Sequence, residues 1–143
     1  MDDSAAAARR ILTEFHVWAV VGASSNPARA SNEVSRFLIG HGYEVIPVNP
    51  AMHEVHGRQA YPDLRAAAEA ARAGGRPIEV VDIFRRADLA GVHVDEAIEI
   101  GARAVWMQLG VIDEEAAQRA RATGLLVAMD RCPMIELPRL QMR

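Results

Sequence analysis

The chain has 143 residues, half of them hydrophobic, and a formal net charge of −3 with acidic and basic residues interspersed. This length predicts one domain over residues 1–143 with a single substantial core, and the charge balance excludes the basic surface of a nucleic-acid binder. The chain contains no Lys, which excludes Schiff-base chemistry and a Walker-type phosphate loop.

The expected elements alternate between helices and strands. The apolar runs are of strand length and nearly continuous, which is typical of strands covered on both faces of a parallel sheet. The segments between them start with capping residues and end at Gly. In chain order we expect a helix over 4–15, a strand over 17–21, a helix over 32–42, a strand over 43–48, a helix over 63–75, a strand over 78–84, a helix over 88–101, a strand over 104–109, a helix over 113–124 and a strand over 125–129.

This alternation predicts an α/β fold. Right-handed crossovers would give a Rossmann-like, doubly wound, mainly parallel sheet with helices on both faces and an extra N-terminal helix. The expected helix starts are Ser4, Ser31, Asp63, Asp88 and Asp113. In such sheets ligands bind outside the carboxyl ends of the strands, near the switch in strand order.

The stretch "VVGASSNPARASNEV" follows the first predicted strand at such an end. Gly22 allows a tight turn. Donors for a diphosphate then come from the hydroxyls of Ser24 and Ser25, from the backbone N–H groups up to Asn26 and from the start of the following helix. The stretch has neither G-x-G-x-x-G nor a Walker sequence, so a capped loop that binds nothing remains the alternative.

The second predicted strand ends in Val-Asn-Pro. An NAD site needs an acid there to hold the ribose 2′-hydroxyl, whereas this strand ends at Asn49 and Pro50. Ordinary NAD use is therefore disfavoured. NADP would need an Arg at this place, and Arg58 keeps that alternative open.

Six segments together resemble a known family. They are "VVGASSNPARASNEVSRFL", "GYEVIPVNP", "AYPDL", "VVDIFRR", "AVWMQLGVIDEEAAQRAR" and "VAMDRCPMIE", which follow one another from about Phe15 to Leu140. This order resembles the small stand-alone CoA-binding domain proteins, which are related to the CoA-binding domain of the succinyl-CoA synthetase alpha subunit. The core of the domain would then span about 15–140.

The resemblance implies that coenzyme A lies across the strand ends as the ligand. Its adenosine diphosphate part would meet the loop after the first strand, with Arg29 as a phosphate donor. Gln108 would close one side of the pocket. The residues expected to bind CoA are Gly22, Ser24, Ser25, Asn26, Arg29, Asn49, Pro50, Ile83, Phe84, Arg85 and Gln108.

We expect a binding module for CoA or an acyl-CoA rather than an enzyme. The chain has Met134 where many family members have Lys, and the phosphorylated-His domain of the synthetase is absent from it. The alternative function is an NADP-linked or thioester-handling enzyme, for which Cys132 beside Arg131 would be the reactive thiol. We assign no catalytic residues.

The His residues give little indication of a further site. His53 and His56 have a spacing that suits a metal on a helix, yet they lie in a predicted loop, so we expect no metal site. His93 has no evident partner in the sequence. The lack of a long apolar run predicts no membrane partner and a cytoplasmic protein, and the sequence is compatible with a homo-oligomer.

Overall fold

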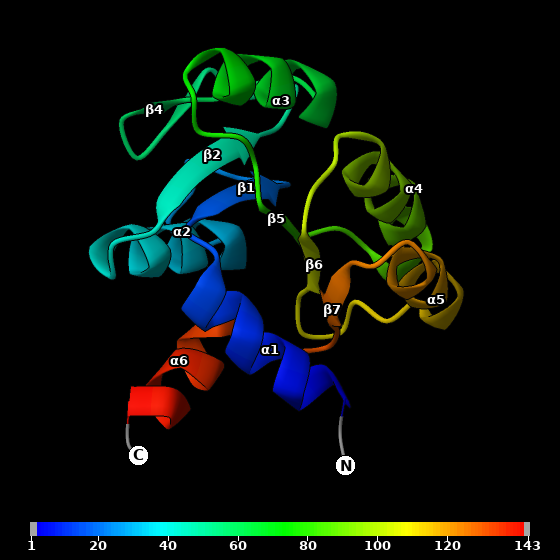
Figure 1. Ribbon diagram of the computed structural model, residues 1–143. Coiled ribbons are helices and arrows are strands. Elements are labelled where there is room, and N and C mark those ends of the chain that lie inside the picture. The colour runs from blue at the N-terminus through cyan, green and yellow to red at the C-terminus, as the bar shows by residue number, and fades with distance from the viewer. Residues whose placement is uncertain (1–2, 142–143) are drawn as a thin grey trace.

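The centre of the molecule is a five-stranded sheet in which every neighbouring pair of strands is parallel (Figure 1). The computed structural model describes residues 3–141. The strand order is β2-β1-β5-β6-β7. The bounds of these strands are Val17–Val21 for β1, Glu44–Val48 for β2, Val80–Ile83 for β5, Ala104–Met107 for β6 and Leu126–Ala128 for β7.

Helices cover both faces of the sheet, so the fold is α/β and Rossmann-like, as the sequence predicts. One core forms between the sheet and α3, α4 and α5, and the other between the sheet and α1, α2 and α6 (Figure 1). The helix bounds are Asp3–Glu14 for α1, Ala30–Gly40 for α2, Leu64–Ala73 for α3, Ala87–Glu99 for α4, Glu114–Ala122 for α5 and Pro133–Gln141 for α6.

The two cores differ in the size of their side chains. On the α3, α4 and α5 side, the buried helix residues are mostly Ala, which lets these helices lie close to the strands. On the other side, the fully buried Trp18 and Trp106 pack with ring centroids 5.5 Å apart. The indole Nε1 of Trp106 donates to the carbonyl of Arg131 over 2.8 Å, which joins β6 to the segment before α6.

Two elements were absent from the sequence-based prediction. The segment after β2 forms a short antiparallel hairpin of β3 (Glu54–Val55) and β4 (Arg58–Gln59). The segment after β7 forms α6, which begins at Pro133 and contains Pro138. Pro lacks an N–H donor and usually marks a helix end, so two Pro residues within nine positions do not predict a helix here.

Three expected helix starts also differ in the structure. Ser4 lies inside α1, which already includes Asp3, and so it is not the cap. The cap position of α2 is Arg29 rather than Ser31, and that of α4 is Arg86 rather than Asp88.

The two outer strands of the sheet each have a neighbour outside the sheet. Beside β2, Tyr61 donates its N–H to the carbonyl of Pro47 over 3.0 Å, and its own carbonyl accepts from Asn49 N over 2.9 Å. After β7, the hydroxyl oxygen of Ser4 accepts from Met129 N over 2.8 Å. These contacts attach the segment before α3 and helix α1 to the sheet.

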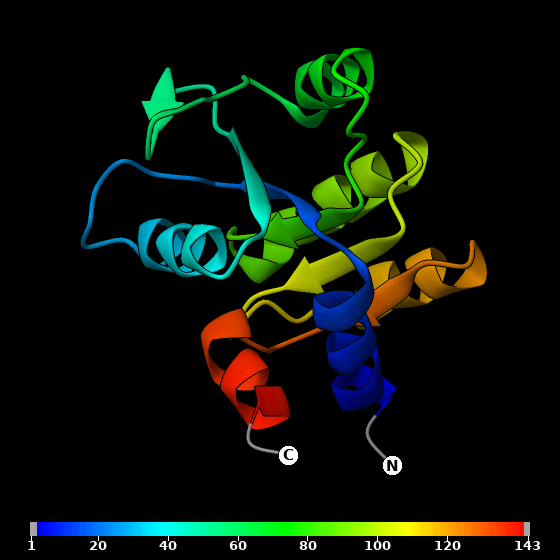
Figure 2. The ribbon, with the colours of Figure 1, turned by 60° about the vertical axis from the view of Figure 1, so that its left-hand side comes forward.

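The strand order places the topological switch between β1 and β5. The chain runs from β1 to β2 on one side, and then returns through α3 to β5 on the other side of β1. Figure 2 shows the strands pointing toward the side on which the β1–α2 loop projects. The carboxyl edge at this switch is therefore where a ligand site is expected.

Candidate functional site

Gly22 draws the carboxyl ends of three strands together. Its φ is +86°, and a Cβ at this position would overlap the carbonyl oxygen of Phe84. Its N–H donates to the carbonyl of Val48 over 2.9 Å, and Phe84 N donates to the carbonyl of Val21 over 2.9 Å. Because only Gly fits this close approach, the ends of β1, β2 and β5 lie against one another.

Side chains on either side fix the loop that follows. Asn49, at the end of β2, donates its amide to the carbonyl of Ala23 over 2.8 Å, and Asn32 in α2 donates to the carbonyl of Ser24 over 2.9 Å. Within the loop, the hydroxyl of Ser24 accepts from Asn26 N over 3.0 Å. These hydrogen bonds hold the loop backbone in one arrangement.

The start of α2 lies open at this loop. The cap residue Arg29 makes no side-chain cap hydrogen bond. Among the residues that the structure describes, the N–H groups of Ala30 and Ser31 have no hydrogen-bond acceptor. Unpaired N–H groups and the helix dipole make such a terminus favourable for an anion.

A cavity of about 480 Å³ lies between this helix start and the ends of the strands. This volume is within the usual range for a small-molecule site. Its lining combines polar and charged side chains with apolar ones. Its lining residues are Gly22, Ser24, Arg29, Ala30, Ser31, Asn49, Met52, Phe84, Arg85, Arg86, Gln108, Leu109 and Val111.

The charged groups around this cavity are all cationic. Three Arg side chains and no acidic side chain line it. Arg86 pairs with Asp88 at 3.2 Å, whereas Arg29 and Arg85 form no ion pair with any residue in 3–141. The site therefore has at least two guanidinium groups available for a phosphate.

A second, smaller cavity adjoins the first on the side of α3 and α4. Its volume is about 190 Å³, and it shares Gly22, Asn49 and Arg85 with the larger cavity. The remaining lining residues are Val21, Val48, Pro50, Pro62, Asp63, Leu64, His93 and Glu96. The two cavities adjoin at the residues that they share, and we refer to them together as the cleft.

The structure brings most of the predicted site residues to this cleft. Pro50 lines only the smaller cavity. Three predicted residues line neither cavity: Ser25, whose hydroxyl lies 3.5 Å from the Met52 sulfur, Asn26, whose side chain accepts from Ala28 N, and Ile83, which is fully buried in the core.

Sequence reasoning missed several lining residues. Met52 gave no signal, because a single apolar residue in a loop has no pattern. Leu109 was expected at the end of a strand over 104–109, whereas β6 ends at Met107 and Leu109 lies in the loop that follows. His93 did have one: its Nδ1 lies 2.7 Å from Glu96 Oε1, and a spacing of three residues on a helix predicts that two side chains meet. The expectation that His93 lacks a partner was wrong.

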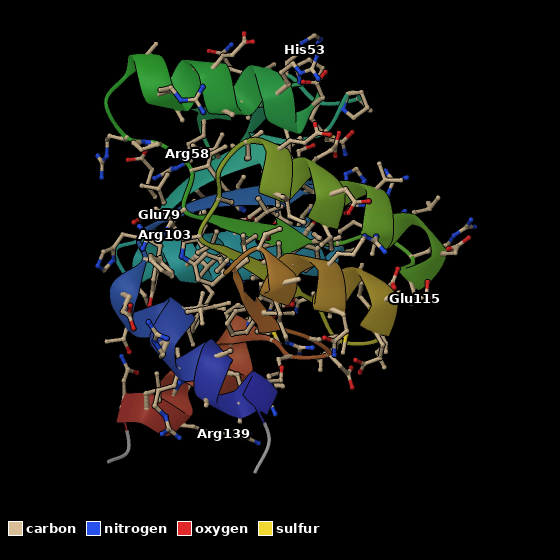
Figure 3. All side chains as sticks on the ribbon, turned by 45° about the vertical axis from the view of Figure 1, so that its right-hand side comes forward. His53, Arg58, Glu79, Arg103, Glu115 and Arg139 are labelled. Atoms are coloured by element: carbon tan, nitrogen blue, oxygen red, sulfur yellow. The ribbon has the colours of Figure 1, made fainter. Side chains whose placement is uncertain are left out.

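Arg58 does not face the end of β2, as the NADP alternative would require. Its guanidinium donates to the carbonyl of His56 over 2.9 Å, and it lines a separate surface hollow beside Glu44 and Ile46. Figure 3 shows Arg58 on the same side of the molecule as Glu79. Glu79 precedes β5 and so lies at the amino end of this strand, away from the carboxyl ends where the cleft lies. The NADP alternative thus loses the residue on which it depended.

Cys132 and Asp82 are buried in the interior and line neither cavity. Cys132 is 8% exposed, belongs to the core on the α2 side, and lines neither cavity. Asp82 is fully buried between Val20 and Trp106, and neither of its carboxylate oxygens has a hydrogen-bond partner among the described residues. It therefore caps no backbone group, and burial raises its pKa well above the usual range.

No group of three or more His, Cys, Asp or Glu side chains in the described part of the chain is arranged to hold a metal ion. His56 instead places its Nε2 2.9 Å from the carbonyl of Asn32. None of the helices between residues 3 and 141 has the length and apolar character needed to cross a bilayer.

Comparisons with known proteins give one consistent picture. A family model described as "CoA binding domain" matches residues 16–138. The uncharacterized protein YneT of Bacillus subtilis is 38% identical over 129 residues, which are 90% of each chain. A hypothetical protein from Pyrococcus horikoshii has a structure that is similar at a TM-score of 0.85, with 39% identity over 99% of this chain and 93% of its own.

A larger enzyme contains a similar fold. The structure of a dinucleotide-forming acetyl-coenzyme A synthetase from Candidatus Korarchaeum cryptofilum matches 82% of this chain with a TM-score of 0.67. The match covers 26% of the synthetase and the identity is 23%, so this likeness concerns the fold.

Proposed function

This chain belongs to the family of CoA-binding domains, and we propose that the cleft at the carboxyl edge of its sheet binds coenzyme A, free or as an acyl-CoA. The observation that supports this proposal most directly is the unpaired start of α2 beside Arg29 and Arg85, with no acid in the lining of the large cavity. A diphosphate needs this combination of N–H donors and guanidinium groups.

The parts of CoA match the parts of the cleft in order. The diphosphate would lie in the middle, at Gly22, the N–H groups of Ala30 and Ser31, and Arg29. The pantetheine arm would extend along the apolar side chains that line the large cavity, among them the 53% exposed Leu109. The adenosine would occupy the smaller cavity.

The lining chemistry supports binding rather than catalysis. Among the described residues that line the large cavity, none is His, Cys, Asp, Glu or Tyr, so no general base or activated thiol lines the part of the cleft that would hold the pantetheine arm. We also propose a cytoplasmic location, which the unpaired Cys132 supports.

The test is the melting temperature of the ligand-free protein with CoA, acetyl-CoA, NADPH and ATP in parallel. We expect a rise with CoA, because a ligand at about 100 times its Kd adds about 2.7 kcal/mol to the free energy of unfolding. Arg29→Gln should weaken CoA binding about tenfold, since it removes a charge-assisted hydrogen bond. Arg36→Gln, on the same helix but outside the cleft, should leave CoA binding unchanged.

Two outcomes would contradict the proposal. Protein that is folded and free of ligand, but whose melting temperature does not change with CoA or acetyl-CoA, does not have this function. A rise with NADPH alone would favour the dinucleotide alternative.

A further inference from the structure

The smaller cavity has apolar walls and a polar rim on one side. Val21, Val48 and Leu64, all less than 5% exposed, form the buried wall. Pro50 and Pro62 add flat rings without N–H groups. A slot with these walls favours a planar, mostly apolar ring system.

Apart from Asn49 and Arg85, which the smaller cavity shares with the larger one, its polar side chains are Asp63, His93 and Glu96, and these carry hydrogen-bond acceptors. Asp63 already uses one carboxylate oxygen to accept from Ala66 N over 2.8 Å at the start of α3. On α4, His93 Nδ1 and Glu96 Oε1 lie 2.7 Å apart, with side chains that are 20% and 35% exposed. Within residues 3–141, neither His93 Nε2 nor Glu96 Oε2 has another hydrogen-bond partner.

The contact with Glu96 determines what His93 can offer. A carboxylate only accepts, so Nδ1 of the imidazole must carry the proton that it donates to Glu96. In the neutral ring, Nε2 is then an acceptor. The pair therefore presents only acceptors to the rim, and these require an amine donor on the ligand.

We propose that the His93–Glu96 pair selects adenine in the smaller cavity by accepting hydrogen bonds from its exocyclic amine. Hypoxanthine and guanine carry a carbonyl oxygen at this position, which would face an acceptor without a proton between them. This inference rests on the proposed function, because it assigns the base of the same ligand. The new element of this inference is that α4, which lies outside the phosphate-binding loop, determines which base the protein binds.

The test compares ADP with inosine diphosphate as competitors of CoA, measured by calorimetric displacement. In the wild-type protein, ADP should displace CoA about ten times more effectively, since an acceptor without a donor loses a hydrogen bond at the base. Glu96→Gln introduces a donor and should reduce this ratio to about 2 or less. His93→Phe, which keeps a ring but removes the acceptor, should also reduce it.

Glu99→Gln is the matched control, because Glu99 lies one turn further along α4, is exposed, and does not line the smaller cavity. This variant should keep the ratio of the wild-type protein. Equal displacement by the two diphosphates in the wild-type protein, or an unchanged ratio in both site variants, would overturn the inference while leaving CoA binding intact. A wild-type protein that binds no CoA would overturn the proposed function itself.

Discussion

At the scale of single residues, Gly22 carries the strongest constraint in the site. Several other glycines in the chain have a positive φ but open space around them, so an added methyl group would cost only backbone strain. At Gly22, the methyl group would also overlap the Phe84 carbonyl, which directly follows the neighbouring strand β5 and whose residue donates its N–H to the carbonyl of Val21. Conformation and packing both require Gly at this position.

We expect Gly22→Ala to lower the free energy of unfolding by about 3 kcal/mol or more, because it combines a strained φ with a steric overlap in a packed region. Gly101→Ala tests the first cause alone, since Gly101 has a φ of +78° and no atom within 4 Å of the added methyl group. Its cost should be about 1 kcal/mol. Urea unfolding of the two variants measures the difference, and equal losses would refute the overlap.

The sequence signal for this residue was partial. A lone Gly after an apolar run predicted a tight turn, and that turn is present. The overlap with Phe84 was beyond prediction, because it depends on which strand lies next to β1. Local patterns carry no information on this pairing.

At the scale of elements, the helix starts differ in whether a side chain caps their first N–H groups. Asp63 and Asp113 cap α3 and α5, each accepting from the N–H three residues later. Helix α2 has no such side chain at its cap position. The start of α2 lines the large cavity, and its first N–H groups are thus available to a ligand.

Asp113→Ala should lower the free energy of unfolding by about 1 kcal/mol, since Ala cannot accept from Ala116 N. Asp113→Asn retains a capping oxygen and should lose less. Glu114→Ala is the control, because this acid also lies in the first turn, near the helix dipole, but its side chain makes no hydrogen bond or ion pair with any other residue in 3–141. Thermal unfolding without ligand gives all three values, and a loss for Glu114→Ala as large as for Asp113→Ala would argue against the cap.

The regular elements were predictable because each has a local pattern. Strands β1, β2, β5, β6 and β7 were found in the apolar runs, with ends that differ by a few residues. Helix α6 and the β3–β4 hairpin were not found. Pro138 lies within α6, and the helix is held by contacts of Leu137 with the core on the α2 side, which is information that its sequence does not contain.

At the scale of the whole molecule, the central sheet contains an ionisable side chain that has no hydrogen-bond partner in the described part of the chain. Asp82 lies in β5, between β1 and β6, and both its oxygens are buried among apolar residues. Burial disfavours the charged carboxylate and raises the pKa of Asp82 well above its usual range. The folded protein therefore binds a proton that the unfolded chain releases at about pH 4.

This difference makes the stability depend on pH. Below about pH 4, Asp82 is protonated in both the folded and the unfolded state. As the pH rises above this value, only the unfolded chain loses the proton. The free energy of unfolding therefore falls by up to about 1.4 kcal/mol per pH unit until the pH reaches the pKa of Asp82 in the folded protein. Asp82→Asn removes this decrease. The stability of the variant relative to the wild-type protein should therefore increase between pH 4 and 7.

Urea unfolding over this pH range provides the measurement, and Asp88→Asn is the control because Asp88 is exposed at the start of α4. The control difference should remain flat. A flat difference for Asp82→Asn as well would mean that this carboxyl titrates normally in the folded protein.

The pairing of segments at the two sheet edges limits how the protein can meet other proteins. An exposed edge strand is a template on which a second chain can add a strand, and such addition leads to aggregation. Here Tyr61 already takes hydrogen bonds along β2, whose Pro47 has no N–H to offer, and Ser4 occupies the N–H of Met129 after β7. A second chain that adds a strand would therefore have to displace Tyr61 beside β2 or Ser4 after β7, so these contacts disfavour extension of the sheet by a partner protein.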